Sequence, residues 1–186
     1  MEILLVRHGK PAIDQFPRLS AQDMRHWIDA YNQAGVRSDP PPSPALTAAV
    51  KNSRTLVTSG LKRAVESART LGFYHPQISD PLFREADLPH GDGRSLKLPP
   101  NLWAAVFRLS WFAGYSRNAE SMTDCRRRME IAAQRLVEVA HDGSPVLLVG
   151  HAIANRFIAG HLLATGWQGP KSPGSGYWGF GLYRKD

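Results

Sequence analysis

The chain begins with a continuous apolar run, Ile3 to Val6, that stops abruptly at Arg7-His8-Gly9. An unbroken apolar run of this length is typical of a strand buried on both faces, as in a parallel sheet covered by helices. Gly9 permits a tight turn directly after the strand. The sequence therefore places a cation and an imidazole at the carboxyl end of a buried strand, which is the edge where open α/β sheets bind ligands.

Two later apolar runs end in a similar way. Thr55 to Thr58 stops at Ser59-Gly60, and Val146 to Val149 stops at Gly150-His151. The second of these runs is apolar throughout, which predicts a central strand. Each strand is followed by a helical pattern, as in a sheet built from strand–helix units.

Helices are expected in several places between and after these strands. The segments are Leu19 to Ala34, Ala45 to Asn52, Leu61 to Leu71, Asn101 to Phe112, Glu120 to Ala140 and Ala152 to Ala164. Ile78 to Arg84 is expected to be a weak strand, and Tyr177 to Tyr183 an edge strand. Alternating strands and helices predict a three-layer α/β/α sandwich with a mostly parallel central sheet. The length of 186 residues predicts a single domain over residues 1–186.

Two clusters of similar side chains have ordinary structural interpretations. Trp103, Phe107 and Trp111 recur every four residues and form one helical stripe, which favours a buried packing surface beside the binding edge; a lid over that edge is the alternative. The run Arg126-Arg127-Arg128 is expected on the solvated side of its helix.

Composition limits the classes of function. One cysteine, Cys125, excludes an intrachain disulfide and a cysteine-based zinc site, and fits a reducing compartment. Arg7 and His8 interrupt the first apolar run, so we expect no signal peptide, no membrane span and a cytoplasmic location. The net charge of +7 favours anionic partners, although the arginines are scattered and no nucleic-acid-binding motif is recognisable.

The carboxyl ends of parallel strands meet at one edge of a sheet, so we expect the polar residues at these three ends to converge. They are Arg7, His8, Ser59, Arg63 and His151. Two arginines and two histidines around one point would bind an anion the size of a phosphoryl group, and a neutral imidazole could attack its centre. Fixed cations make a metal unnecessary for this chemistry, and we expect no metal and no cofactor.

The order of these segments resembles the histidine phosphatase superfamily, the phosphoglycerate mutase-like proteins. Arg7-His8-Gly9 is similar to the family's first motif, and Ser59 followed by Arg63-Ala64 resembles its second. Arg84-Glu85 and the glycine-containing loop after it resemble the segment that carries the family's acid. Val149-Gly150-His151 resembles the last motif, so the resemblance covers most of the chain.

The resemblance implies a role for each of these residues. His8 would be phosphorylated, and Arg7, Arg63 and His151 would hold the phosphoryl group, with Ser59 among the substrate-binding residues. Glu85 would protonate the leaving oxygen and then deprotonate the attacking water. Two nearby carboxylates, Asp87 and Asp92, are rivals for the role of the acid.

Three functions remain open from the sequence. The first is a metal-independent phosphomonoesterase acting on a small phosphorylated metabolite. The second is a mutase-type phosphotransferase, which must exclude water; we expect little inserted material after Glu85 to form a closed cover, and therefore favour hydrolysis. The third is a non-catalytic module that binds a phosphorylated ligand or nucleic acid.

Overall fold

A computed structural model describes residues 1–13, 15–141 and 143–186 of the chain. In chain order the elements are β1 (Glu2–Arg7), β2 (Leu19–Ser20), α1 (Met24–Gln33), α2 (Pro44–Ala49), η1 (Val50–Asn52), β3 (Thr55–Thr58), α3 (Lys62–Thr70), β4 (Ile78–Ser79), η2 (Pro81–Phe83), β5 (Lys97–Leu98), α4 (Pro100–Phe112), α5 (Met122–Ala140), β6 (Val146–Gly150), α6 (Ala152–Ala164) and β7 (Phe180–Arg184).

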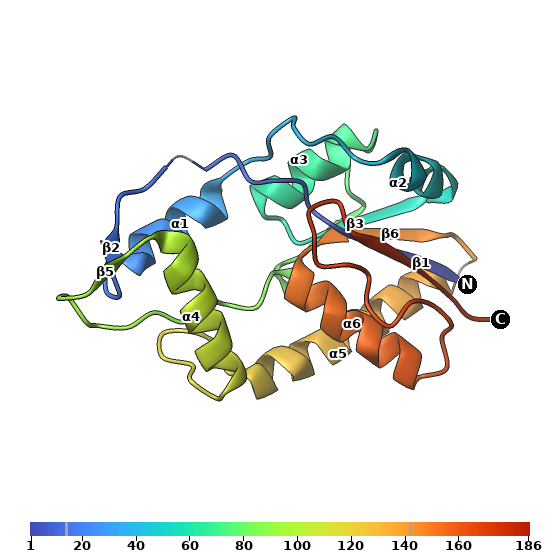
Figure 1. The fold of residues 1–186 in the computed structure, drawn as a ribbon. Coiled ribbons are helices and arrows are strands. Elements are labelled where there is room, and N and C mark those ends of the chain that lie inside the picture. Colours follow the sequence, from blue (N-terminus) through green and yellow to red (C-terminus); the bar gives the residue numbers. More distant parts are fainter. Residues whose placement is uncertain (14, 142) are drawn as a thin grey trace.

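The main sheet places the three predicted strand ends side by side. Over the described residues it has five strands in the order β4-β3-β6-β1-β7 (Figure 1). β4, β3, β6 and β1 run parallel, whereas β7 pairs antiparallel with β1 at the edge. β6 is central and buried along its whole length, as its apolar sequence predicts. The carboxyl ends of β3, β6 and β1 therefore lie on adjacent strands at one edge.

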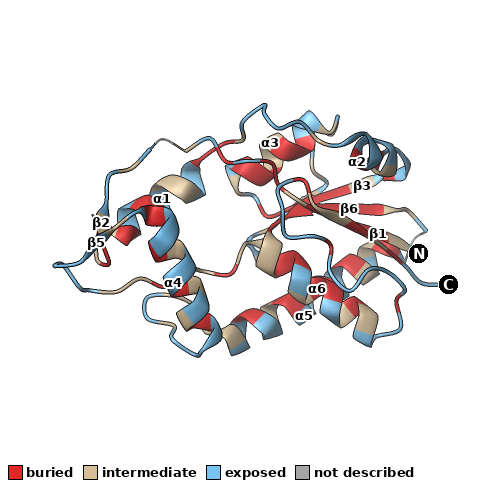
Figure 2. Cartoon of the chain, viewed as in Figure 1, coloured by how far each residue is buried: buried red, intermediate tan, exposed pale blue. Residues whose placement is uncertain are grey.

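Helices cover both faces of this sheet. Ile3 and Leu5 share one core cluster with buried residues of α5 and α6. Leu4 and Val6 point the opposite way, into a second cluster with α2 and α3. This alternation follows from the two-residue period of a strand, and the strands are buried from both sides (Figure 2). The predicted three-layer α/β/α fold with a mostly parallel sheet is confirmed.

A smaller unit lies beyond the sheet, away from the chain termini. It comprises α1, α4 and the short antiparallel pair of β2 with β5 (Figure 1). Met24 and Trp27 of α1 pack against Trp103 and Phe107 of α4 in a separate apolar cluster. We call this unit the cap. The expectation that little material follows Glu85 to form a cover is thus wrong, because residues 88–112 fold against α1.

The aromatic stripe lies on α4, as predicted, and its residues are buried. Trp103 and Phe107 pack within the cap, whereas Trp111 reaches the main core beside α5 and α6. The stripe is therefore a packing surface that joins the cap to the sheet domain. In the described part of the chain, no helix is long and apolar enough to cross a membrane.

Three predicted boundaries are wrong. The strand expected from Tyr177 begins only at Phe180, because Tyr177 and Trp178 lie in a turn. The helix expected from Leu19 begins only at Met24, because Leu19 pairs with Leu98 as a strand. The strand expected over Ile78 to Arg84 ends at Ser79, where Pro81 opens a 3₁₀ turn and the Asp80 side chain accepts a hydrogen bond from the Leu82 amide at 2.8 Å.

Candidate active site

The turn after β1 determines the tautomer of His8. The His8 Nδ1 atom lies 2.7 Å from the carbonyl oxygen of Gly9, which can only accept, so Nδ1 carries the proton. The other ring nitrogen, Nε2, is then the unprotonated one. Gly9 is required here, because a Cβ at this position would lie 2.4 Å from the Trp178 ring and 2.5 Å from Val36.

Burial keeps the His8 ring neutral. The side chain is 2% exposed, and burial lowers the pKa of His8 from 6.5 to about 3. The hydrogen bond to Gly9 opposes this shift, whereas the charges of Arg63 and Arg7 add to it. A neutral imidazole is the nucleophilic form of the residue, so His8 is available for attack at and well below pH 7.

Arg7 and Arg63 approach the same point from β1 and α3. The Arg7 guanidinium lies 4.4 Å from the centre of the Tyr177 ring and donates to the carbonyl oxygen of Ser175. Arg63 is 1% exposed, and its Nη1 donates to the carbonyl oxygen of Tyr31 in α1 at 2.9 Å. The Nε atoms of both arginines are buried and have no partner among the described residues. Two charged donors therefore remain for an anion.

His151 follows β6 and is completely buried. Its ring centre lies 5.1 Å from that of His8, and its Nε2 is 2.7 Å from the Ser59 hydroxyl oxygen. The same oxygen accepts a hydrogen bond from the Leu61 amide, and the Ser59 hydroxyl can donate its own proton to Nε2 of His151. In the tautomer in which the Ser59 hydroxyl donates to Nε2, the proton of the His151 ring is on Nδ1. Nδ1 is buried without a partner in the part of the chain that the structure describes.

The electrostatic surroundings keep His151 neutral as well. Burial is the largest cause that holds the pKa of His151 well below its usual range, and the neighbouring His8, Arg63 and Arg7 lower it further. A neutral His151 offers one N–H group for a hydrogen bond. Positive charge at the site therefore comes from the two arginines.

Glu85 lies at the amino end of α6, where free backbone amides are available. Its Oε1 accepts from the Ala154 amide at 3.0 Å, and its Oε2 accepts from the Ile153 amide at 3.3 Å. These bonds hold the carboxylate at the first turn of α6, the helix that directly follows His151. The two rivals are engaged elsewhere: Asp87 forms an ion pair with Arg84 at 3.6 Å, and Asp92 forms one with the exposed Arg117.

The sequence interpretation missed Arg128. Arg126 and Arg127 are exposed, as expected, but the Arg128 side chain is only 13% exposed. It donates to the carbonyl oxygens of Leu82 and Arg84 at 2.9 Å each, and forms an ion pair with Glu120. The prediction of a solvated triplet is therefore wrong for Arg128, which fixes the segment that carries Glu85. In the sequence, Arg128 cannot be told apart from Arg126 and Arg127, so nothing there indicates that it holds the Glu85 segment.

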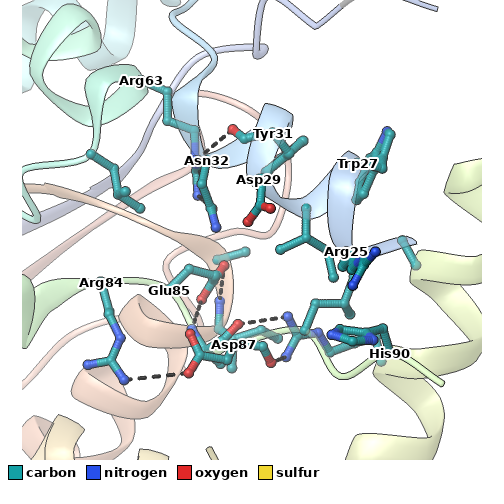
Figure 3. Close-up of a pocket in the computed structure, with 18 of the residues that line it drawn as sticks. Arg25, Trp27, Asp29, Tyr31, Asn32, Arg63, Arg84, Glu85, Asp87 and His90 are labelled. Atoms are coloured by element: carbon teal, nitrogen blue, oxygen red, sulfur yellow. Dashed lines mark hydrogen bonds and ion pairs between the residues drawn. The ribbon is translucent and has the colours of Figure 1, made fainter. Parts of the chain in front are cut away.

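Three of these side chains border a cleft of about 500 Å³ between the sheet edge and the cap, whereas His8 and His151 are not among its lining residues. Arg7, Arg63 and Glu85 line it from the sheet domain, and Asp29, Asn32 and Trp27 line it from α1 (Figure 3). Over the described residues, no group of three or more histidine, cysteine or carboxylate side chains is placed to hold a metal ion. The cleft can instead hold an anion beside two arginines and a carboxyl group, and the buried His8 directly follows one of these arginines, Arg7.

Residues 42–175 match the histidine phosphatase superfamily (branch 1). The matched segment includes Ser59, Arg63, Glu85 and His151 but begins after Arg7 and His8. A search of curated proteins gave no match.

Several solved structures share the fold. One is the product of an open reading frame of Mycobacterium tuberculosis, with a TM-score of 0.65 and 14% identity, covering 100% of this chain and 91% of that chain. Another is a mycobacterial glucosyl-3-phosphoglycerate phosphatase, with a TM-score of 0.59 and 20% identity, covering 97% of this chain and 88% of that chain. A third, mycobacterial hydrolase 2, has a TM-score of 0.56 and 22% identity, covering 88% of this chain and 72% of that chain. At these identities the similarity supports the fold.

Proposed function

Because the chain belongs to the histidine phosphatase superfamily, an enzyme family of the phosphatase and mutase kind, we propose that it is a metal-independent phosphomonoesterase acting through a phosphohistidine on His8. One observation carries the proposal. The buried, neutral His8 has Arg7, Arg63 and His151 as neighbours, and each of these residues has a buried nitrogen that lacks a partner in the described part of the chain. A phosphoryl group matches these donors in charge and size.

The first half-reaction follows from this arrangement. Nε2 of His8 attacks the phosphorus atom, and the bond from phosphorus to the leaving oxygen breaks. Arg7, Arg63 and the Nδ1–H of His151 stabilise the charge on the phosphoryl oxygens. Glu85 donates a proton to the leaving oxygen, which departs as an alcohol.

The second half-reaction reverses these proton transfers. Glu85 accepts a proton from water, and the water oxygen attacks the phosphorus atom of phosphohistidine. The bond from nitrogen to phosphorus breaks, which releases inorganic phosphate and restores neutral His8. Ser59 holds the His151 ring in position through its hydroxyl group, so its contribution to substrate binding is indirect. The substrate is a small phosphate ester, and nucleic acid is not a partner in this proposal.

The test is a trapped intermediate. The enzyme, mixed with radiolabelled p-nitrophenyl phosphate and quenched in alkaline detergent, should carry label that is stable to base and lost in acid. His8→Ala should remove the label and reduce turnover by several orders of magnitude. His75→Ala, which changes an exposed histidine in a loop, is the matched control and should retain both. Label that persists in folded His8→Ala protein would exclude the assignment. Full activity in excess chelator is expected, and a strict metal requirement would contradict the proposed charge arrangement.

The cap supports one alternative, a phosphotransferase of the mutase type. A mutase keeps water from its phosphoenzyme, and α1 and α4 fold over the cleft. The two reactions differ in the fate of the label. Hydrolysis releases one inorganic phosphate for each alcohol formed, whereas a mutase returns the phosphoryl group to a hydroxyl group of the organic molecule.

A further inference from the structure

The outer side of α4, opposite its buried aromatic stripe, is apolar and exposed (Figure 2). Five side chains form this surface, which we call the apolar face: Leu102, Ala105, Val106, Leu109 and Phe112. Steps of three and four positions keep them on one side of the helix along its length. Leu109 alone is 71% exposed. A surface helix normally presents polar residues to water, so an apolar outer side indicates a contact surface.

Exposed apolar side chains are concentrated around this helix. Within the part of the chain that the structure describes, six of the ten exposed large apolar side chains lie in the segment 96–115. They are Leu96, Leu102, Val106, Leu109, Phe112 and Tyr115. Single exposed apolar residues are normal on a protein surface, whereas a cluster of them marks an interaction site. A partner is therefore expected at α4 rather than elsewhere.

The charge around the apolar face is positive. The stretches 15–33 and 88–118, which contain the elements of the cap, hold six arginine or lysine residues and three aspartates. The segment 94–117 has no Asp or Glu. Arg94 and Lys97 are exposed just before the helix, and Arg117, exposed after it, pairs with Asp92. An apolar surface bordered by cations matches an anionic lipid surface, where acyl chains lie below phosphate groups.

A second copy of the chain fits this surface less well. A helix of 13 residues is about 20 Å long and, with its side chains, about 10 Å wide. One side of it therefore covers about 200 Å² in projection, whereas each partner of a standard protein interface buries about 800 Å². A symmetric dimer would also bring two copies of the same basic cap together, and like charges repel.

The apolar face adjoins the side of α4 that lines the cleft. Ala104 and Arg108 line the cleft, and Phe112 continues their row at the next step of four positions. Arg108 itself is turned toward the sheet domain, where it donates to the carbonyl oxygens of Ala86 and Asp87 at 2.9 and 3.2 Å. Contact through the apolar face would hold the cleft close to the surface that is bound.

We propose that the apolar face of α4, together with Arg94 and Lys97, docks the protein on an anionic lipid surface. The helix lies in the plane of this surface, with Leu102, Val106 and Leu109 at the boundary between headgroups and acyl chains and the basic side chains at the level of the phosphates. Such a contact needs no membrane-spanning helix. It is independent of the proposed function, because no residue of the phosphoryl site takes part in it.

Sedimentation with vesicles tests the docking. The whole protein should bind vesicles of phosphatidylglycerol and phosphatidylcholine in equal parts, and should bind pure phosphatidylcholine vesicles more weakly. Leu102→Ser combined with Leu109→Ser should weaken binding by at least about 10-fold, the effect of exposing a single buried leucine side chain. Arg94→Gln combined with Lys97→Gln should weaken binding to the anionic vesicles by about 5-fold for each charge.

The matched controls change similar residues elsewhere on the surface. Tyr74→Ser combined with Ile131→Ser removes two exposed apolar side chains, and Lys51→Gln combined with Arg54→Gln removes two exposed charges. Both should bind vesicles like the wild type. All of these variants change exposed positions outside the catalytic residues, so hydrolysis of p-nitrophenyl phosphate in the absence of vesicles and thermal unfolding should stay close to the wild type.

A fluorescent label reports which side of the molecule enters the lipid. Leu109→Cys can be labelled selectively, because the native Cys125 is completely buried. A nitrobenzoxadiazole label at position 109 should shift to shorter wavelength with the anionic vesicles, and the same label on Ile131→Cys should not. No binding to anionic vesicles, binding that the two leucine substitutions do not alter, or a dimer in solution that these substitutions dissociate would overturn the inference.

Discussion

His8 and His151 are two buried, neutral imidazoles beside two arginines, and this arrangement links the proposed chemistry to stability. Placing a proton on either ring would add a charge to a buried, already positive site, and for this reason the pKa values of both residues lie below the ordinary value. The same rings in the unfolded chain titrate near their ordinary pKa of 6.5.

This difference predicts that the protein is destabilised by mild acid. Between pH 6.5 and about 3 the unfolded chain binds the His8 proton and the folded chain does not, so the free energy of unfolding falls as the pH decreases. Above pH 6.5 this contribution is fully present. Each such histidine contributes a slope of up to about 1.4 kcal/mol per pH unit. Urea unfolding of the wild type and of His8→Gln at pH 5, 6 and 7 measures it. The variant should show the shallower slope, and equal slopes would contradict the prediction.

Glu85 allows a second prediction at the residue scale. An alkoxide is a poor leaving group and needs a proton, whereas p-nitrophenolate needs little help. Glu85→Gln should therefore reduce hydrolysis of alkyl phosphates by about 10²- to 10⁴-fold, and that of p-nitrophenyl phosphate far less. The measurement is kcat/KM for both esters.

Asp87→Asn and Asp92→Asn are the controls for Glu85, since both carboxylates already pair with arginines. Neither should show a dependence on the leaving group. If one of them does and Glu85→Gln does not, the acid has been assigned to the wrong residue, and the role of His8 is unaffected.

At the scale of elements, helix α5 determines where Glu85 lies. Arg128 donates to carbonyl oxygens of the segment that leads from η2 to Glu85, and pairs with the largely buried Glu120. The amino end of α6 then receives the Glu85 carboxylate. Two helices that are both far from Glu85 in the sequence thus hold its side chain in place.

Loss of Arg128 should therefore affect both folding and the acid step. Arg128→Ala leaves Glu120 without its closest cationic partner and two carbonyl oxygens without a donor, which should cost about 3–5 kcal/mol. Arg127→Ala, at the exposed neighbouring position, should change stability by less than about 0.5 kcal/mol. Urea unfolding compares the two variants. Arg128→Lys, which keeps the charge, should fold and should lose more activity on alkyl phosphates than on p-nitrophenyl phosphate. A Lys variant with unchanged activity would contradict a role in positioning Glu85.

At the scale of the whole molecule, the net charge of +7 raises the question of nucleic-acid binding. Arg63 and Arg128 lie inside the molecule and Arg7 is half-buried at the cleft, and all three contact backbone carbonyl oxygens. These charges are not part of an external phosphate-binding surface. We therefore expect no tight binding of single-stranded or duplex DNA at physiological salt. Fluorescence anisotropy over a salt series measures it, and salt-dependent binding below micromolar concentration would favour the binding-module alternative.

The sequence by itself determined the sheet and the positions of the residues at its edge. The runs that became β1, β3 and β6 were recognisable because burial on both faces requires continuous apolar residues, a local property. Arg7, His8, Arg63 and His151 could be placed at one edge because parallel strands end on the same side. The local pattern does not fix every helix end. It places Leu19 in a helix, whereas Leu19 pairs as a strand with Leu98, a residue far along the chain.

Only the tertiary structure decided which groups those residues contact. The partner of Ser59 is 92 positions away, and the amides that hold Glu85 are 68 and 69 positions away. Arg128 belongs to a triplet of identical side chains, and packing alone distinguishes it from Arg127. The cap and the cleft-facing Asp29 and Asn32 likewise depend on how α1 packs against α4 and Arg63. A sequence pattern records how apolar each position is, whereas hydrogen bonds between distant segments depend on the relative placement of packed elements, which local periodicity does not specify.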